Sequence, residues 1–280
     1  MENATTFFAT LSAWLWGWPM IILLLGTHVF LTIRLRFPQR KLLTAIRLSV
    51  QRDSSQQGDV SQFGALATAL AATIGTGNII GVATAVALGG PGAVFWCWLT
   101  GMLGIATKYS EALLAIKYRV RSEGGRMQGG PMYALERGLG WRKMGVLFAV
   151  FTALAAFGIG CTVQANAIST IMHASYGIGT EVCGAVLTLL TAAVIIGGVS
   201  SISKVCSMLV PLMALLYVLG CVYILQANAS YVVPALRLIV RSAFSPEAAG
   251  GGFAGGSVTV AARYAIARGP LSNESALGAA

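Results

Sequence analysis

The stretch ALATALAATIGTGNIIGVATAVAL, residues 65–88, decides how this sequence folds. It is long and apolar enough to cross a bilayer, and it contains no charged residue. Its middle, Gly75-Thr76-Gly77-Asn78, is a poor helix former that leaves backbone N–H and C=O groups unpaired. At membrane depth such groups are tolerated only where the backbone is buried in protein or lines a polar cavity. We therefore predict a membrane helix broken at its midpoint, with a second half that begins near Asn78, as in the substrate and ion sites of secondary transporters.

The composition places the chain among integral membrane proteins. Hydrophobic residues make up 56% of it and charged residues only 10%. The formal net charge of +10 does not indicate nucleic-acid binding, because Lys and Arg lie almost wholly between apolar segments, where they act as topology signals. The five cysteines fall inside apolar segments at no metal-ligand spacing, so we expect free thiols and no transition-metal site. His28 and His173 have no partner at catalytic spacing, which argues against an enzyme.

Seven membrane spans are predicted, and the basic residues orient them. The spans are residues 11–33, 65–88, 93–116, 145–175, 182–199, 205–226 and 246–266. Of the 19 Lys and Arg residues, only Arg237 and Arg241 then lie on the outer side, so the N-terminus is predicted to be outside. Residues 38–52 and 228–242 are expected to lie along the two membrane surfaces as helices, and residues 117–143 to form an inner loop.

A second interruption falls in the last predicted span. Residues 248–256, AAGGGFAGG, place small residues around the single large side chain of Phe253. Four unbroken spans separate the two broken ones, which enter from opposite sides of the membrane. This is the spacing expected of an inverted repeat whose units begin at residue 65 and near residue 246. The sequence ends before the second unit is complete, so we expect a truncated chain.

Several motifs together resemble one family over essentially the whole chain. They are AATIGTGNIIGVA at 71–83, GGPGAVFW at 89–96, GGP at 129–131, VQAN at 163–166, AGGGFAG at 249–255 and RGPLSNE at 268–274. In this order they resemble the alanine or glycine:cation symporter family, also called the sodium:alanine symporter family. After Asn273-Glu274 the family usually continues Ala-Gly-Met-Gly-Ser, and the departure here again favours a truncated member.

The resemblance implies an all-α integral membrane protein with the leucine-transporter-like inverted repeat of the APC superfamily. Residues 1–34 would be an extra N-terminal transmembrane helix and residues 35–64 a cytoplasmic basic linker. Residues 65–227 would form the first five-helix repeat, and residues 228–280 an outer interfacial segment with the start of the second repeat. The implied activity is symport of alanine or glycine with Na⁺ or H⁺ across a prokaryotic inner membrane, without an organic cofactor or a nucleic-acid partner.

The resemblance also implies which residues form the site. Carbonyl groups of Ala71, Thr73 and Ile74 and the side chain of Asn78 would bind the cation. Substrate-binding residues would be Thr76, Gly77, Gln164, Phe253 and Gly256, with Gly77 meeting the carboxylate through its backbone.

Alternatives remain open at this point. Gln164 could join helices and Phe253 could serve packing alone. The chain could also be a non-transporting membrane fragment or subunit that needs a partner, or a related symporter for another small amino acid.

Overall fold

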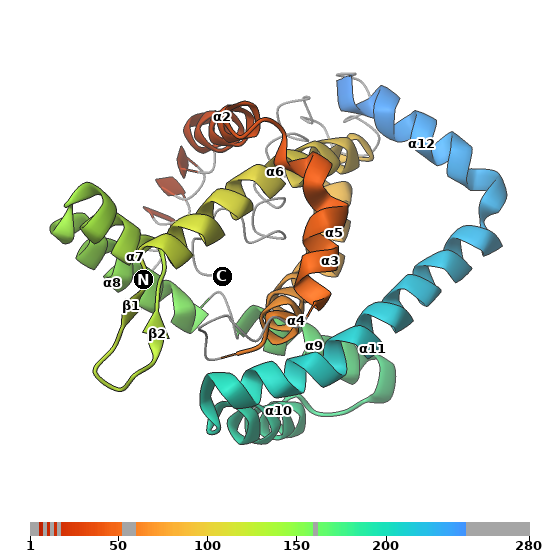
Figure 1. Cartoon of the computed structure of the whole chain (residues 1–280). Coiled ribbons are helices and arrows are strands. Elements are labelled where there is room, and N and C mark those ends of the chain that lie inside the picture. Colours follow the sequence, from red (N-terminus) through yellow and green to blue (C-terminus); the bar gives the residue numbers. More distant parts are fainter. Residues whose placement is uncertain are drawn as a thin grey trace. The chain divides into compact units, whose positions relative to one another are not determined.

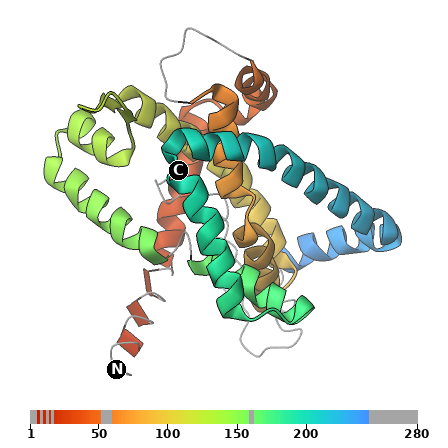
Figure 2. The same cartoon turned by 90° about the horizontal axis from the view of Figure 1, so that it is seen from below.

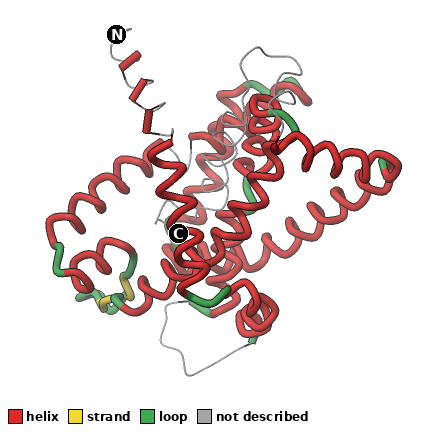
Figure 3. The backbone as a smooth tube through the Cα atoms, turned by 90° about the horizontal axis from the view of Figure 1, so that it is seen from above, coloured by secondary structure: helices red, strands yellow, loops and turns green. Residues whose placement is uncertain are grey.

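The computed structural model describes residues 6–7, 10–11, 14–15, 18–51, 60–158 and 162–244, without the side chains of residues 18 and 76–78. Almost all of these residues are helical, and the strands among them form one short hairpin (Figure 3). The predicted all-α class is therefore correct apart from that hairpin. The chain divides into two compact units. One contains the described residues of Met1–Arg40, Asn78–Ser110 and Cys221–Leu277, and the other those of Lys41–Gly77 and Glu111–Gly220.

The helices and strands follow one another as shown in Figure 1. In chain order they are α2 (Trp18–Arg34), η1 (Pro38–Lys41), α3 (Leu42–Val50), α4 (Gln62–Thr73), α5 (Thr76–Gly89), α6 (Gly92–Lys117), β1 (Val120–Arg121), β2 (Met127–Gln128), α7 (Pro131–Tyr133), η2 (Ala134–Gly138), α8 (Arg142–Gly158), α9 (Thr162–Tyr176), α10 (Thr180–Ile195), α11 (Gly198–Ala227) and α12 (Ala229–Phe244).

Within the first unit, polar contacts join α2 to α6. Nδ1 of His28 lies 2.6 Å from the hydroxyl oxygen of Thr107, and only 1% of His28 is exposed. One turn along α2, the Thr32 hydroxyl donates to the carbonyl oxygen of Leu103 at 3.5 Å. The side-chain amide of Gln39 donates in turn to the Thr32 hydroxyl at 3.4 Å. Because polar side chains bond across packed membrane helices rather than face lipid, this polar ladder fixes which face of α2 meets α6.

The C-terminal end of α12 packs on the first turn of α6, also within the first unit. A Cβ atom at Gly92 would lie 2.5 Å from the carbonyl oxygen of Ser242 and 2.8 Å from the amide nitrogen of Ala243, so only glycine permits this approach. The indole N–H of Trp96 donates to the carbonyl oxygen of Ala243 at 3.3 Å. The ring of Phe244 lies 6.0 Å from the Trp96 ring, centroid to centroid.

The second unit contains the hairpin and a helix pair. Strand β1 pairs antiparallel with β2, and Gly125 takes a positive φ of 76° in the turn between them. From the sequence, residues 117–143 are assigned to an inner loop without strands, because two-residue strands are too short to produce an alternating pattern. Helices α9 and α10 lie side by side in the two views (Figures 1 and 2). The predicted span at residues 182–199 corresponds to α10, and that at 205–226 to α11.

Among the residues that the structure describes, fewer helices are long and apolar enough to cross a membrane than the seven predicted for the whole chain. Within the described part of the chain, two segments qualify by length and composition, Arg142–Tyr176 and Gly198–Ala227. A third qualifies if the bent pair Pro19–Arg34 and Pro38–Val50 is one span. The halves of the broken helix have 12 and 14 residues, which makes each about 20 Å long and too short to span alone. Residues 246–266 lie outside the described residues, and the seven-span topology stays a prediction.

Candidate broken-helix site

The helix predicted to break does break, at Ile74 and Gly75. Helix α4 ends at Thr73, and α5 begins at Thr76. Ile74 has φ −84° and ψ 72°, and the Gly75 N–H donates to the carbonyl oxygen of Thr73 at 3.0 Å, which is the geometry of an inverse γ-turn. In a continuous helix the Gly75 N–H would bond to the carbonyl of Ala71. The turn therefore removes the helical donor from the Ala71 carbonyl, one of the predicted cation ligands.

The second half of the broken helix starts earlier than we expected. We predicted a start near Asn78, whereas Thr76, Gly77 and Asn78 are the first three residues of α5. Residues that destabilise a helix interior destabilise its first turn much less, because the first N–H groups of any helix lack an acceptor within it. Those N–H groups and the positive end of the helix dipole favour a negatively charged group at this terminus.

The side-chain amide of Gln164 lies against the break. Gln164 is half-buried in the first turn of α9. A Cβ atom placed on Gly75 would be 3.4 Å from both Oε1 and Nε2 of Gln164. The missing side chain at Gly75 thus lets an amide with both a donor and an acceptor approach the interrupted backbone. The structure brings together the break and the predicted substrate contact Gln164, although the two are far apart in sequence.

The remaining predicted residues fall into two groups. Ala71 and Thr73 are half-buried in the last turn of α4, where the Thr73 hydroxyl donates to the carbonyl of Ala69 at 2.9 Å. Neutral carbonyl and hydroxyl oxygens suit a hard cation such as Na⁺. Phe253 and Gly256 lie outside the described residues.

No transition-metal site is present in the part of the chain that the structure describes. There, no three His, Cys, Asp or Glu side chains are close enough to hold a metal ion together. Cys97, Cys183, Cys206 and Cys221 are free thiols, and of these Cys183 is buried.

One contact that positions α4 was not expected from the sequence. Ser61 caps α4 by accepting from the N–H of Gly64 at 3.1 Å. Gly64 is buried, and a Cβ atom added there would collide with the hydroxyl oxygen of Ser203 on α11. The only sequence signal was a pair of small residues in otherwise apolar helices, which does not say that the two are partners.

Comparison with known proteins identifies the family. The family described as the Sodium:alanine symporter family matches residues 1–280. The chain belongs to the sodium:alanine symporter family. This membership confirms the resemblance drawn from the motifs, and it places the chain in a family of transporters rather than enzymes.

Relatives at high identity agree with this membership. The chain is 49% identical over 278 residues to the sodium/alanine symporter AgcS of Methanococcus maripaludis, covering 97% of this chain and 60% of AgcS. It is 50% identical over 274 residues to an uncharacterized transporter of Haemophilus influenzae, with the same two coverages. It is 38% identical over 285 residues to the uncharacterized transporter YflA of Bacillus subtilis, covering 100% of this chain and 60% of YflA. The chain thus spans about 60% of the length of these relatives.

Proposed function

We propose that this chain provides one part of a cation-coupled symporter that carries alanine or glycine with Na⁺ by alternating access. The contact of Gln164 with the break at Gly75 carries the proposal. It brings an amide side chain, the N-terminus of one half-helix and the carbonyl end of the other to one place. Secondary transporters use this combination at broken helices.

An amino acid matches these groups in charge. Its carboxylate would accept hydrogen bonds from the first N–H groups of α5, at Thr76 and Gly77. Its ammonium group would donate to the amide oxygen of Gln164. Phe253 and Gly256 would close the site around the short side chain, as the family resemblance implies.

The coupling ion would sit at the end of α4. Carbonyl oxygens of Ala71, Thr73 and Ile74 and the side chain of Asn78 would be its ligands. Loss of the helical donor at Ala71 supports this assignment, because a carbonyl oxygen without its helical hydrogen bond is a good ligand for a hard cation. A cation bound beside the substrate carboxylate stabilises the doubly occupied site more than either ligand does alone, which is the basis of symport.

The architecture we propose is the leucine-transporter-like inverted repeat in a prokaryotic inner membrane, with the N-terminus outside. The two half-helices α4 and α5 would form the first helix of the first repeat, and α2 would be the extra N-terminal helix. Many large apolar side chains of the described helices are exposed, for example Phe30, Leu212 and Leu216 at 55–63%, which is consistent with contact to lipid.

Uptake of radiolabelled alanine into proteoliposomes tests the proposal. We would assay the 280-residue chain alone and together with the remaining part of AgcS supplied as a second polypeptide. We expect saturable uptake that requires Na⁺ in at least one of the two preparations, with glycine competing. Na⁺-independent uptake, or none in either preparation, would contradict the proposal.

A matched pair of amide variants locates the site. Gln164→Ala should weaken alanine binding by about tenfold or more, because it removes a hydrogen bond to a charged group. Asn166→Ala is the control, since the amide oxygen of Asn166 accepts from the Thr170 hydroxyl of the same helix at 3.0 Å. Equal affinities in the two variants would remove Gln164 from the site.

A further inference from the structure

Helix α12 has two opposite faces, and one of them is buried against other described residues while the other is exposed. Val232 and Ile239 are half-buried and Ala243 is buried, and the three recur on one side of the helix. Arg237 and Arg241 lie one turn apart, roughly opposite that side, and both are exposed. The sequence of α12 contains no acidic residue that could neutralise them.

The docked end of α12 lies among aromatic rings. Phe244 meets Phe95 at 5.1 Å and Trp96 at 6.0 Å between ring centroids, at the first turn of α6. Of these rings, the indole of Trp96 is of the kind that gathers where a membrane helix meets the headgroup layer. This end of α6 follows the turn at residues 89–92 that the predicted topology places outside, so α12 belongs at the outer membrane surface.

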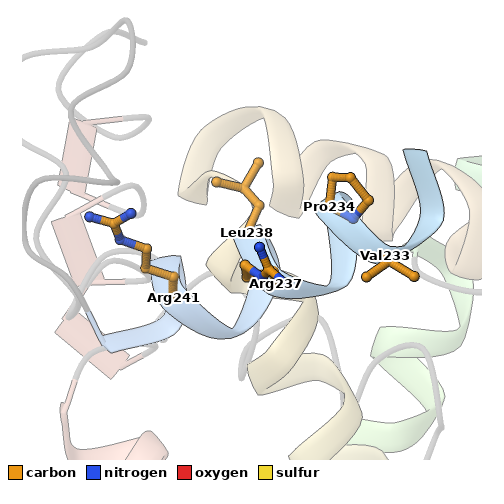
Figure 4. Close-up of a pocket in the computed structure, with 5 residues that line it drawn as sticks. All are labelled: Val233, Pro234, Arg237, Leu238 and Arg241. Carbon is orange, nitrogen blue, oxygen red and sulfur yellow. The ribbon is translucent and has the colours of Figure 1, made fainter. Parts of the chain in front are cut away.

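The arginines border an open groove on the exposed face. It has a volume of about 360 Å³ and is lined by Val233, Pro234, Arg237, Leu238 and Arg241. Figure 4 shows the side chains of Arg237 and Arg241 leaving α12 one turn apart, with Leu238 beside them. The groove therefore combines two guanidinium groups with three apolar side chains. This combination of charged and apolar side chains matches a ligand that is anionic at one end and apolar at the other.

One observation and one prediction about these arginines need an explanation. Within the described part of the chain, neither guanidinium forms an ion pair. In the predicted topology, Arg237 and Arg241 are also the only two of the 19 basic residues on the outer side. The positive-inside rule places basic residues on the inner side and so does not explain these two. We propose that Arg237 and Arg241 bind the phosphate of an anionic phospholipid at the surface of the membrane. This inference goes beyond the proposed symport and does not depend on the substrate.

The geometry suits a phosphodiester. Side chains four residues apart on a helix start about 5–6 Å from one another, so two planar guanidinium forks can reach the oxygens of one phosphate. Val233, Pro234 and Leu238 would contact the glycerol and the upper acyl chains. Amphipathic helices with basic residues bind anionic membrane surfaces in this way.

Native mass spectrometry of the purified chain tests the proposal. The chain would be titrated in detergent with phosphatidylglycerol or with phosphatidylcholine of the same acyl chains. In Arg237→Gln/Arg241→Gln, the tightest phosphatidylglycerol binding should weaken by about 10- to 30-fold, while phosphatidylcholine binding stays unchanged. Arg237→Lys/Arg241→Lys should give an intermediate value, because lysine keeps the charge and loses the bidentate fork.

A charge-matched control separates this site from general attraction. Arg119→Gln/Arg126→Gln removes two exposed charges near the hairpin and should leave the tightest binding intact. Equal weakening in both double variants would overturn the proposal. Competition by millimolar inorganic phosphate that removes all the lipid would identify an anion site instead. Unchanged lipid binding with a lowered melting temperature in Arg237→Gln/Arg241→Gln would show that the arginines pair within the protein, which also refutes a lipid site.

Discussion

Replacing Gly92 by alanine should detach the end of α12 from α6. The new methyl group would meet the Ser242 carbonyl oxygen at 2.5 Å, where an ordinary contact begins near 3.4 Å. The obstacle is backbone, so α12 must retreat by about 0.9 Å rather than rotate a side chain away. That retreat breaks the 3.3 Å hydrogen bond from Trp96 to Ala243, worth about 1 kcal/mol, and weakens the packing of Phe244. With two aromatic contacts at about 0.5–1.5 kcal/mol each, the expected loss is about 2–4 kcal/mol.

Hydrogen–deuterium exchange of α12 and thermal unfolding in detergent would measure this loss. Gly92→Ala should speed amide exchange along α12 and lower the unfolding temperature. Gly101→Ala on the same helix is the control, because a Cβ atom there meets nothing within 4 Å. The control should be neutral or stabilise the protein by up to about 1 kcal/mol, since alanine is the better helix former. If the two variants unfold alike and α12 exchanges at the normal rate, the close approach at Gly92 does not exist.

Three further outcomes are expected. Gly64→Ala should destabilise the chain by about 1–3 kcal/mol through its collision with the Ser203 hydroxyl. In a Ser203→Ala background the same change should cost clearly less, because the contacts that remain are the Ser61 hydroxyl oxygen at 3.0 Å and the Cβ of residue 203 at 3.6 Å. Equal melting-temperature shifts in the two backgrounds would refute this. A double-mutant cycle of His28→Ala and Thr107→Ala should give a coupling of about 0.6–1.7 kcal/mol in unfolding, and additive effects would exclude the hydrogen bond. Replacing Na⁺ by choline should weaken equilibrium binding of labelled alanine, and unchanged affinity would contradict a cation site at the break.

The break and the interfacial helix could be predicted because their signals are local. Glycine at position 75 disfavours a helix wherever it occurs, and the observed turn lies directly beside it. Residues 228–242, with Arg237 and Arg241, are predicted to form an interfacial helix, and α12 occupies Ala229–Phe244. The exact start of α5 was misjudged, because first-turn positions tolerate residues that an interior position does not.

The contacts that hold these helices could not be predicted, because their partners lie far away in the chain. The close approach of Ser242 requires a glycine at position 92, and that of Ser203 requires a glycine at position 64. A glycine in the sequence does not indicate which distant residue packs against it. The contact of Gln164 with Gly75 likewise joins two residues that are far apart in the sequence. The motifs indicated that both residues matter, whereas only the folded chain could bring them into contact.

The polar ladder between α2 and α6 has a consequence for biosynthesis. His28 finds its partner Thr107 79 positions later in the chain. At about 5–20 residues per second, the ribosome needs about 4–16 s to make that partner after His28 has been added. During this interval the imidazole of His28 lacks the Thr107 hydroxyl as its partner in hydrocarbon. The first helix should therefore remain beside the insertion machinery, and enter the lipid only when α6 arrives to pair with it.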